Sequence, residues 1–98
     1  MKFYHATRRE NLPNILNEGI KMHCEGIFLC EKPEDAVKFL VVRGIKDILV
    51  LEVSIRKNSK KLIESFDHSY QFFKCRAFIY MDNIEQENIS NYLAYKFN

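Results

Sequence analysis

The side chain best suited to chemistry lies close to the start of the chain, where His5 follows two aromatic residues and precedes a small residue and a hydroxyl. A neutral imidazole carries one hydrogen-bond donor and one acceptor, so it can donate a hydrogen bond to a polar ligand or accept one from it. A histidine on its own is more often a residue that caps its own loop. Two further strings follow it here, Glu-Gly-Ile at 18–20 and Gly-Ile-Phe at 26–28. Together they make the first forty residues the candidate ligand-binding part of the chain.

The three cysteines, Cys24, Cys30 and Cys75, show no Cys-x-x-Cys spacing. An odd number of thiols without that spacing suits a reducing compartment, where a thiol packs as a small hydrophobic group. A zinc site can be drawn from His23, Cys24 and Cys30 with His68 as a fourth ligand, but its spacing matches no structural zinc module. We therefore expect free thiols and no metal.

Length and composition indicate one globular domain over residues 1–98. The hydrophobic share of 47% is enough for one core and argues against disorder. The formal charge of +2 comes from 15 basic and 13 acidic residues that are largely interspersed, and the densest basic run, at 56–61, is interpreted as a solvated turn. The sequence shows no signal peptide and no apolar run of about eighteen residues, so we expect a cytoplasmic protein without a membrane partner.

Hydrophobic periodicity predicts the elements that position His5 and the two strings. A short strand is expected at 2–5 and a second one at 26–30. Between them, Asn11 is expected to cap a short helix that ends at a left-handed Gly19. Thr7, with a glutamate three residues later, also has the form of a capping box, so an earlier helix start stays open.

The remaining segments complete the fold class. We expect a helix from Pro33 to about Arg43, packed on both sides, and strands at 48–55 and 75–81. Residues 61–73 fit a short helix followed by an extended segment, without a firm assignment, and the tail at 89–97 fits either a last helical turn or a strand. The sequence therefore predicts an α+β domain with a mainly antiparallel sheet and two principal helices.

Residues 4–39 resemble the NAD-binding half of the ADP-ribosyltransferases. The resemblance is to the branch of poly(ADP-ribose) polymerases and diphtheria toxin, and also to the DNA-targeting ADP-ribosyltransferase toxins. It rests on the His-Ala-Thr strand end, the Glu-Gly-Ile helix end and the Gly-Ile-Phe strand start, which cover two of the family's three signature elements. It implies a small, single-domain ADP-ribosyltransferase-like fold that binds NAD as a substrate.

The same resemblance implies a role for individual residues. His5 would hydrogen-bond a ribose hydroxyl of NAD, Ala6 would meet the nicotinamide amide through its backbone, and Thr7 would help to hold that region. Phe28 takes the place of a tyrosine that stacks on the nicotinamide, and stacking needs a ring face but no hydroxyl. Phe39 is the candidate for a second aromatic across the pocket. Simple core packing explains both phenylalanines nearly as well.

The third signature element does not match. In the family a glutamate at the start of a later strand contacts the nicotinamide-ribose hydroxyls and supports an oxocarbenium-like transition state. That position falls here on Ala77, or on Cys75 in a shifted register, where a thiolate is conceivable. Gln71 is the candidate substitute, and Glu64 and Asp67 also precede the strand. Losing one such group costs about a hundred- to a thousandfold in rate, so a slow enzyme and a pure binder are both compatible with the chain.

The RNA 2'-phosphotransferases are a second enzymatic resemblance, because they share this half and also lack the glutamate. They hold the RNA phosphate with arginines, and guanidinium groups are offered here by Arg8, Arg9, Arg43 and Arg76. Arg8 is also a candidate NAD contact. Because the sequence opens with its first signature strand, we do not expect the additional amino-terminal lobe of those enzymes.

Three functional hypotheses follow. The first is transfer of ADP-ribose from NAD to a macromolecular acceptor, protein or nucleic acid, with His5 and Gln71 as candidate catalytic residues. The second is a catalytically inactive module that binds NAD, ADP-ribose or another nucleotide, or that inhibits a partner. The third is a small domain without a ligand, in which the resemblance reaches only the fold. By analogy, a compact modifying protein would suit a bacterial toxin or a phage effector.

Overall fold

The computed structural model describes residues 1–22, 26–56, 58–65 and 77–97. In chain order the elements are β1 (Lys2–Arg8), η1 (Arg9–Asn11), α1 (Leu12–Glu18), β2 (Ile27–Cys30), α2 (Pro33–Val41), β3 (Asp47–Ser54), β4 (Leu62–Ser65), β5 (Ala77–Tyr80), η2 (Gln86–Asn88) and β6 (Ile89–Lys96). The two short elements η1 and η2 are single 3-10 turns that lead into α1 and β6.

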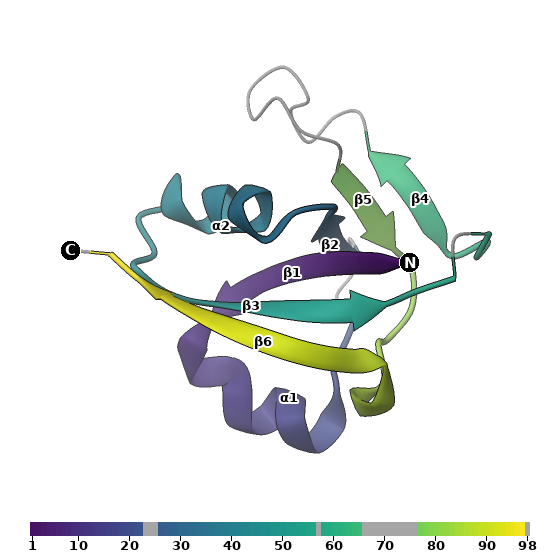
Figure 1. The fold of residues 1–98 in the computed structure, drawn as a ribbon, viewed down its shortest axis with the longest axis horizontal. Coiled ribbons are helices and arrows are strands. Elements are labelled where there is room, and N and C mark those ends of the chain that lie inside the picture. The colour runs from purple at the N-terminus through teal and green to yellow at the C-terminus, as the bar shows by residue number, and fades with distance from the viewer. Residues whose placement is uncertain (23–25, 57, 66–76, 98) are drawn as a thin grey trace.

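The strands form one sheet in the order β4-β5-β2-β1-β3-β6, and every neighbouring pair is antiparallel (Figure 1). Long ladders join β3 to both of its neighbours, with β1 from Lys2↔Ser54 to Arg8↔Ile48 and with β6 from Asp47↔Lys96. The helices lie on opposite faces of the sheet, α2 above it and α1 below it in Figure 1. The predicted α+β class with two principal helices is confirmed.

The centre of the sheet is buried on both faces, which gives two core clusters. The cluster beside α1 contains Phe3, Ile15, Ile20, Ile27, Leu29, Leu49, Leu51, Val53, Ile55, Phe78 and Ile84. The cluster beside α2 contains Cys30, Ala36, Val37, Leu40, Ile48 and Val50. Because successive strand residues point to opposite faces, β3 supplies both clusters, and this explains the unbroken apolar run at its start.

The first helix starts and ends as one of the two alternatives predicts. Asn11 precedes α1, whereas the earlier start at Thr7 is wrong because Thr7 belongs to β1. Gly19 ends the helix with φ of +77°, and its N–H donates to the Ile15 carbonyl at 2.8 Å. A Cβ at Gly19 would lie 2.3 Å from the Ile84 carbonyl oxygen. The close approach of two backbones therefore requires glycine at this position.

Four other expectations are corrected or refined. The first strand runs on from residue 5 to Arg8, because β3 continues to pair with it. The helix α2 buries one side only, and Val41 at its end is 43% exposed, so packing on both sides is wrong. In the ambiguous segment 61–73, Leu62–Ser65 is a strand, and residues 66–73 lie outside the described ranges. The tail is also a strand, β6. Within the described residues, no helix is both long and apolar enough to cross a membrane.

Candidate functional site

A cleft opens where β1 and β2 separate. The pair Tyr4↔Cys30 joins the two strands, and in the described part of the chain the rest of β1 up to Arg8 continues on β3, while β2 pairs with β5 along its whole length. Beyond the joining pair lies a cleft of about 690 Å³, lined by both strands, by α1 from one face of the sheet and by α2 from the other. That volume falls in the usual range of small-molecule sites.

The cleft brings the predicted site residues together. His5, Ala6, Thr7, Arg8, Phe28 and Phe39 all line it. By strand alternation His5 belongs to the sheet face of Phe3, and Phe28 belongs to the face of Cys30. They reach one cavity because the sheet is open between their strands. Gln71 lies outside the described residues.

His5 bridges the two strands with its side chain. Its Nδ1 lies 2.8 Å from the Phe28 carbonyl oxygen. A carbonyl oxygen can only accept, so Nδ1 carries the proton and donates. In the neutral ring this fixes Nε2 as an acceptor. His5 is half-buried, so it both joins β1 to β2 and borders the cleft.

Thr7 and Asn11 form a second polar pair on the wall of the cleft. The Asn11 Nδ2 amide donates to the Thr7 hydroxyl oxygen at 2.8 Å. This bond fastens the end of β1 to the start of α1, because Thr7 belongs to β1 and Asn11 is the last residue of η1, directly before α1. Asn11 and Asn14 also line the cleft, and sequence reasoning did not single them out as ligand contacts.

The two phenylalanines come from different elements, Phe28 from β2 and Phe39 from α2. Both are half-buried and both line the cleft. Phe39 also packs against the core cluster beside α2. Each ring therefore has part of its surface in protein contact and part at the cavity, which is compatible with stacking on a flat ligand.

Of the two positions predicted for the family glutamate, the described one does not line the cleft. Ala77 is 2% exposed, sits opposite Cys30 in β5 and is not among the lining residues, and Cys75 lies outside the described residues. Glu64 is half-buried on β4 and does not line the cleft either. Among the described lining residues, the one carboxylate is that of Glu18, at the end of α1. The sequence showed this residue only as part of a helix terminator.

Two arginines line the cleft. Arg8 and Arg43 line it, and both also line a second hollow of about 430 Å³ together with Arg9 and Lys46. Arg76 lies outside the described residues. Arg43 follows α2 and Arg8 ends β1, so their place in the lining of the same hollows depends on how the helix packs on the sheet.

Cys30 is the described cysteine, and it is buried. In the described part of the chain, no three His, Cys, Asp or Glu residues gather as metal ligands. The other residues of the hypothetical zinc site lie outside the described ranges. Comparison of the chain with protein-family models gives no match, and comparison with curated proteins gives none either.

Proposed function

We propose that this chain binds NAD in the cleft and transfers ADP-ribose to a macromolecular acceptor. The observation that supports this best is that six residues chosen from the sequence for NAD contacts line one cavity of suitable size. Those residues come from β1, β2 and α2, so their convergence required the strands to separate at this place.

The side chains have complementary tasks in this proposal. Phe28 offers a ring face on which the nicotinamide stacks. His5, which donates through Nδ1 to the Phe28 carbonyl, accepts a ribose hydroxyl at Nε2. Arg8 and Arg43 line the cleft, and their positive charges neutralise the negative charge of the diphosphate. When the acceptor is held in line with the anomeric carbon, the bimolecular reaction step becomes effectively unimolecular.

In the reaction, the bond between the nicotinamide nitrogen and the anomeric carbon breaks, and nicotinamide leaves with the electron pair. The acceptor forms its bond to the same carbon and loses a proton. Positive charge develops on the sugar during this step, and a carboxylate nearby lowers its energy. Glu18 is the described carboxylate of the cleft, so we assign this task to Glu18 in place of the family glutamate.

A catalytically inactive nucleotide-binding module is the second candidate. The observation that favours it is that Ala77, one of the two positions predicted for the family glutamate, is buried in β5, carries no charge and does not line the cavity. Such a module would use the same contacts of His5 and Phe28. It would hold NAD without cleaving it.

The test measures nicotinamide release and thermal unfolding in parallel. NAD at about a hundred times its Kd stabilises a protein by about 2.7 kcal/mol, which for a chain of this size raises Tm by roughly 10 °C or more. We expect that rise and slow release of nicotinamide from the native chain, and loss of both in Phe28→Ala. A rise in Tm without release in any cell lysate would establish the binding module, and neither effect would contradict the proposal.

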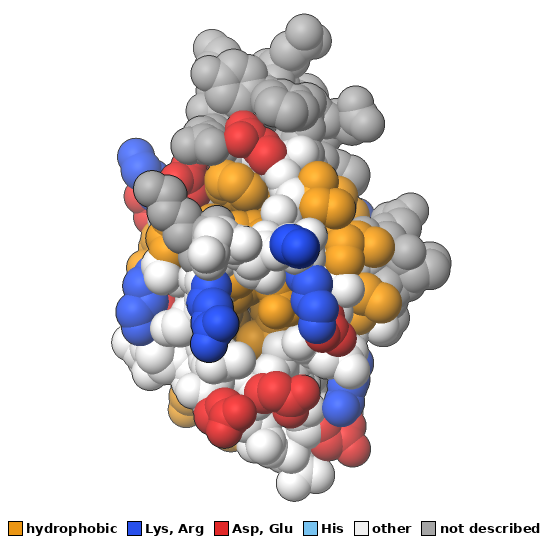
Figure 2. All heavy atoms as spheres, turned by 90° about the vertical axis from the view of Figure 1, so that its right-hand side faces the viewer, with side chains coloured by type: hydrophobic (Ala, Val, Ile, Leu, Met, Phe, Trp, Pro, Cys, Tyr) orange, Lys and Arg blue, Asp and Glu red, His pale blue; other side chains and the backbone are white. Residues whose placement is uncertain are grey.

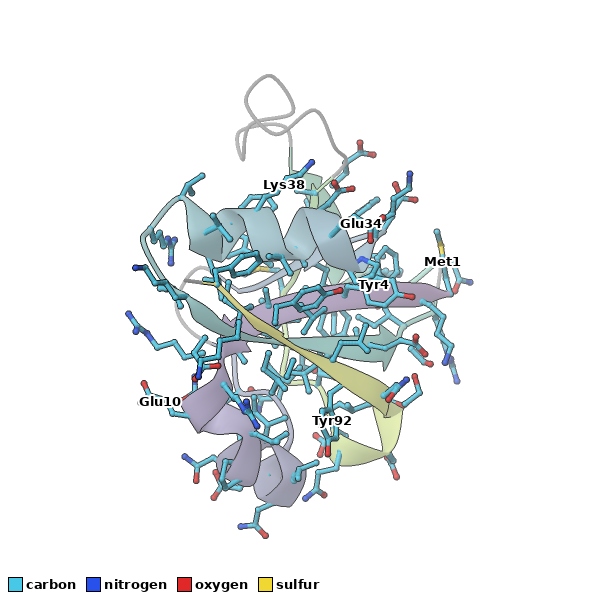
Figure 3. The ribbon with its side chains drawn as sticks, turned by 60° about the vertical axis from the view of Figure 1, so that its left-hand side comes forward. Met1, Tyr4, Glu10, Glu34, Lys38 and Tyr92 are labelled. Atoms are coloured by element: carbon cyan, nitrogen blue, oxygen red, sulfur yellow. The ribbon has the colours of Figure 1, made fainter. Side chains whose placement is uncertain are left out.

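Glu18→Gln separates binding from catalysis. We expect this variant to keep the NAD-dependent rise in Tm and to lose about a hundredfold in the rate of nicotinamide release. Glu34→Gln is the matched control, because Glu34 is exposed and does not line the cleft. Figure 3 labels Glu34 on α2. Equal rates in the two variants would exclude a catalytic task for Glu18.

A further inference from the structure

The last strand, β6, forms one edge of the sheet, and within the described residues it pairs with β3 alone (Figure 1). It spans eight residues, and from Asn91 to Lys96 its pairing with β3 is regular. The register shift opposite Glu52 and Val53 affects only its first residues. The strand at the other edge, β4, spans four residues. The long, regular edge of this sheet is therefore that of β6.

The backbone groups of alternate β6 residues point to the free edge. The Phe97 N–H donates to the Lys46 carbonyl at 2.8 Å, so the odd-numbered residues from 97 back to 91 exchange hydrogen bonds with the β3 side. The N–H and C=O groups that point away from β3 then belong to Tyr92, Ala94 and Lys96. The Tyr92 N–H agrees with this direction, because it donates to the Asn91 side-chain oxygen at 2.8 Å.

This edge has few of the features that keep an edge strand from pairing. Edge strands are usually protected by charged side chains, by proline or by a short length. From Ile89 to Tyr95 the strand has no charged residue and no proline, and Lys96 is its one charge. Tyr92 and Leu93, at its centre, are each 46% exposed. A partner strand would satisfy the outward backbone groups and cover both side chains.

The two exposed side chains lie on opposite faces of the sheet. Tyr92 pairs with Leu51, which belongs to the core cluster beside α1. Leu93 pairs with Val50, which belongs to the core cluster beside α2. Figure 3 labels Tyr92 on the side of α1. A strand added at this edge therefore contacts one apolar side chain on each face, as neighbouring strands of one sheet do.

The start of β6 is acidic. Glu85 and Glu87 lie just before the strand, and both are exposed. Lys2 and Glu52, which also lie at this end, form an ion pair at 3.2 Å, so their charges cancel. Figure 2 views the molecule from this end, and acidic side chains gather in the lower part of that face.

The end of β6 is basic. Lys96 is exposed, and Lys46 lies next to it, because the Lys46 carbonyl accepts the bond from the residue after Lys96. Asp47 is the ladder partner of Lys96, but it also lies 4.0 Å from Arg9. These four side chains together keep a positive excess. The free edge therefore carries opposite charges at its two ends.

We propose that two copies of this chain associate through β6, edge to edge and antiparallel, and form a dimer with one continuous sheet. A two-fold axis relates the copies, so the acidic start of each strand lies beside the basic end of the other. A parallel pair would place Lys96 beside Lys96, and like charges in that position destabilise neighbouring strands. In the dimer, a carbonyl of the second copy replaces the Asn91 side chain as the acceptor for the Tyr92 N–H.

The dimer goes beyond the proposed function and does not depend on it. Among the described residues that line the cleft, none belongs to β6. The pairing therefore leaves the cleft of each copy open, and it requires no NAD.

The test compares two variants that each place a lysine on an exposed aliphatic residue. Leu93→Lys puts a charge at the centre of the edge, and the two-fold axis places that charge twice in the interface. Val42→Lys is the matched control, because Val42 is 57% exposed directly after α2 and lies outside β6. Sedimentation equilibrium of the full chain over a range of concentrations measures the Kd of the dimer. Circular dichroism and urea unfolding establish that both variants are folded.

We expect a monomer–dimer equilibrium for the native chain and for Val42→Lys, with the same Kd. In Leu93→Lys the Kd should rise at least about tenfold, which corresponds to about 1.4 kcal/mol. Hydrogen exchange identifies the paired strand. When about nine tenths of the native chain is dimeric, exchange of the Ala94 and Lys96 N–H groups should be about tenfold slower than in the monomer. The β4 residues should exchange equally at all concentrations.

Three results would overturn the inference. The first is a native chain that stays monomeric at every concentration, and the second is an equal Kd for the two lysine variants. The third is the growth of assemblies larger than a dimer, with slower exchange on β4 as well as on β6, because pairing of β6 with β4 of another copy does not close. Failure of NAD binding or of nicotinamide release would contradict the proposed function and leave the dimer untouched.

Discussion

At the scale of single residues, His5 has a structural task that the sequence did not indicate. Its ring donates to the Phe28 carbonyl across the strands that separate beyond Tyr4↔Cys30. A side chain thus supplies a link between the strands near the point where they diverge. The same bond fixes the tautomer that the ring presents to a ligand.

His5→Ala should therefore cost stability as well as NAD binding. Loss of one hydrogen bond to a partly buried carbonyl typically costs about 1 kcal/mol. We expect that loss in urea unfolding, together with at least about a tenfold weaker affinity for NAD. His5→Gln keeps a side-chain donor and should recover part of the stability but not the affinity. Unchanged NAD affinity in His5→Ala would show that the histidine only braces the strands.

Glu52 provides a pH test of the sheet that does not involve the cleft. Hydrogen bonds from Ser90 and Lys2, and a third from Tyr4, lower the pKa of the Glu52 carboxyl below its usual value of 4.5. Figure 3 shows Tyr4 on β1 on the side of α2. A carboxyl with a lowered pKa stabilises the fold at neutral pH, and this contribution disappears as the pH falls through the folded-state pKa.

We expect Glu52→Gln to be less stable than the native chain at pH 7 and to approach its stability under acid. The measurement is the free energy of unfolding in urea at a series of pH values from about 7 down to about 3. A constant difference between the two proteins over that range would show that the carboxylate makes no favourable contact in the fold.

At the scale of elements, two of the three glycines with positive φ allow a comparison. Gly19 has φ of +77° and Gly44 has φ of +81°, so alanine strains the backbone at both positions. At Gly19 the new Cβ also meets the Ile84 carbonyl at 2.3 Å, whereas at Gly44 it meets nothing within 4 Å. Gly19 stands between α1 and Ile20, which pairs with Ile84 through two backbone hydrogen bonds of 2.8 Å.

Gly19→Ala should lower the free energy of unfolding by about 3 kcal/mol or more, and Gly44→Ala by about 1 kcal/mol. Urea unfolding of the two variants measures the difference. Equal losses would mean that the segment of Ile84 moves aside at little cost. Since Gly19 and Ile20 line the cleft, Gly19→Ala should also weaken NAD binding.

Several elements could be predicted because their signals are local. The strand at 26–30, Gly19 as the end of the first helix and the buried face of β3 depend on periodicity and on backbone freedom within a few residues. The extension of β1 to Arg8 could not be predicted in this way, because Thr7 and Arg8 are polar and become strand only through pairing with β3. The tail was ambiguous for the same reason, since β6 lies at the sheet edge and is mostly exposed.

The residues of the candidate site also divide into those with a local sequence signal and those placed only by the fold. His5, Ala6, Thr7 and Phe28 could be selected from short strings in the sequence, and the fold places them around one cleft. Glu18 could not be selected as a site residue, because it is the polar end of a helix and faces the cleft only through packing on the sheet. Arg8 and Arg43 could be selected as candidate phosphate contacts, but their place on the wall of the same cleft follows only from the fold.

At the scale of the whole molecule, the separation of two central strands accounts for the cleft. Each strand keeps a partner on its other side, β3 for β1 and β5 for β2, so backbone hydrogen bonds are retained around the opening. The two core clusters on opposite faces hold the sheet together while α1 and α2 border the gap. The domain therefore has a cleft between two central strands of its sheet and still keeps a core cluster on each face.

The most direct test of the central claim is an NMR titration of isotope-labelled protein with NAD. The account predicts saturable chemical-shift changes concentrated at residues 5–8 and at Phe28 and Phe39, with Glu18 and Arg43 at the margins of the affected region. Changes confined to the outer strands β4 and β6, or no saturable change at all, would contradict it.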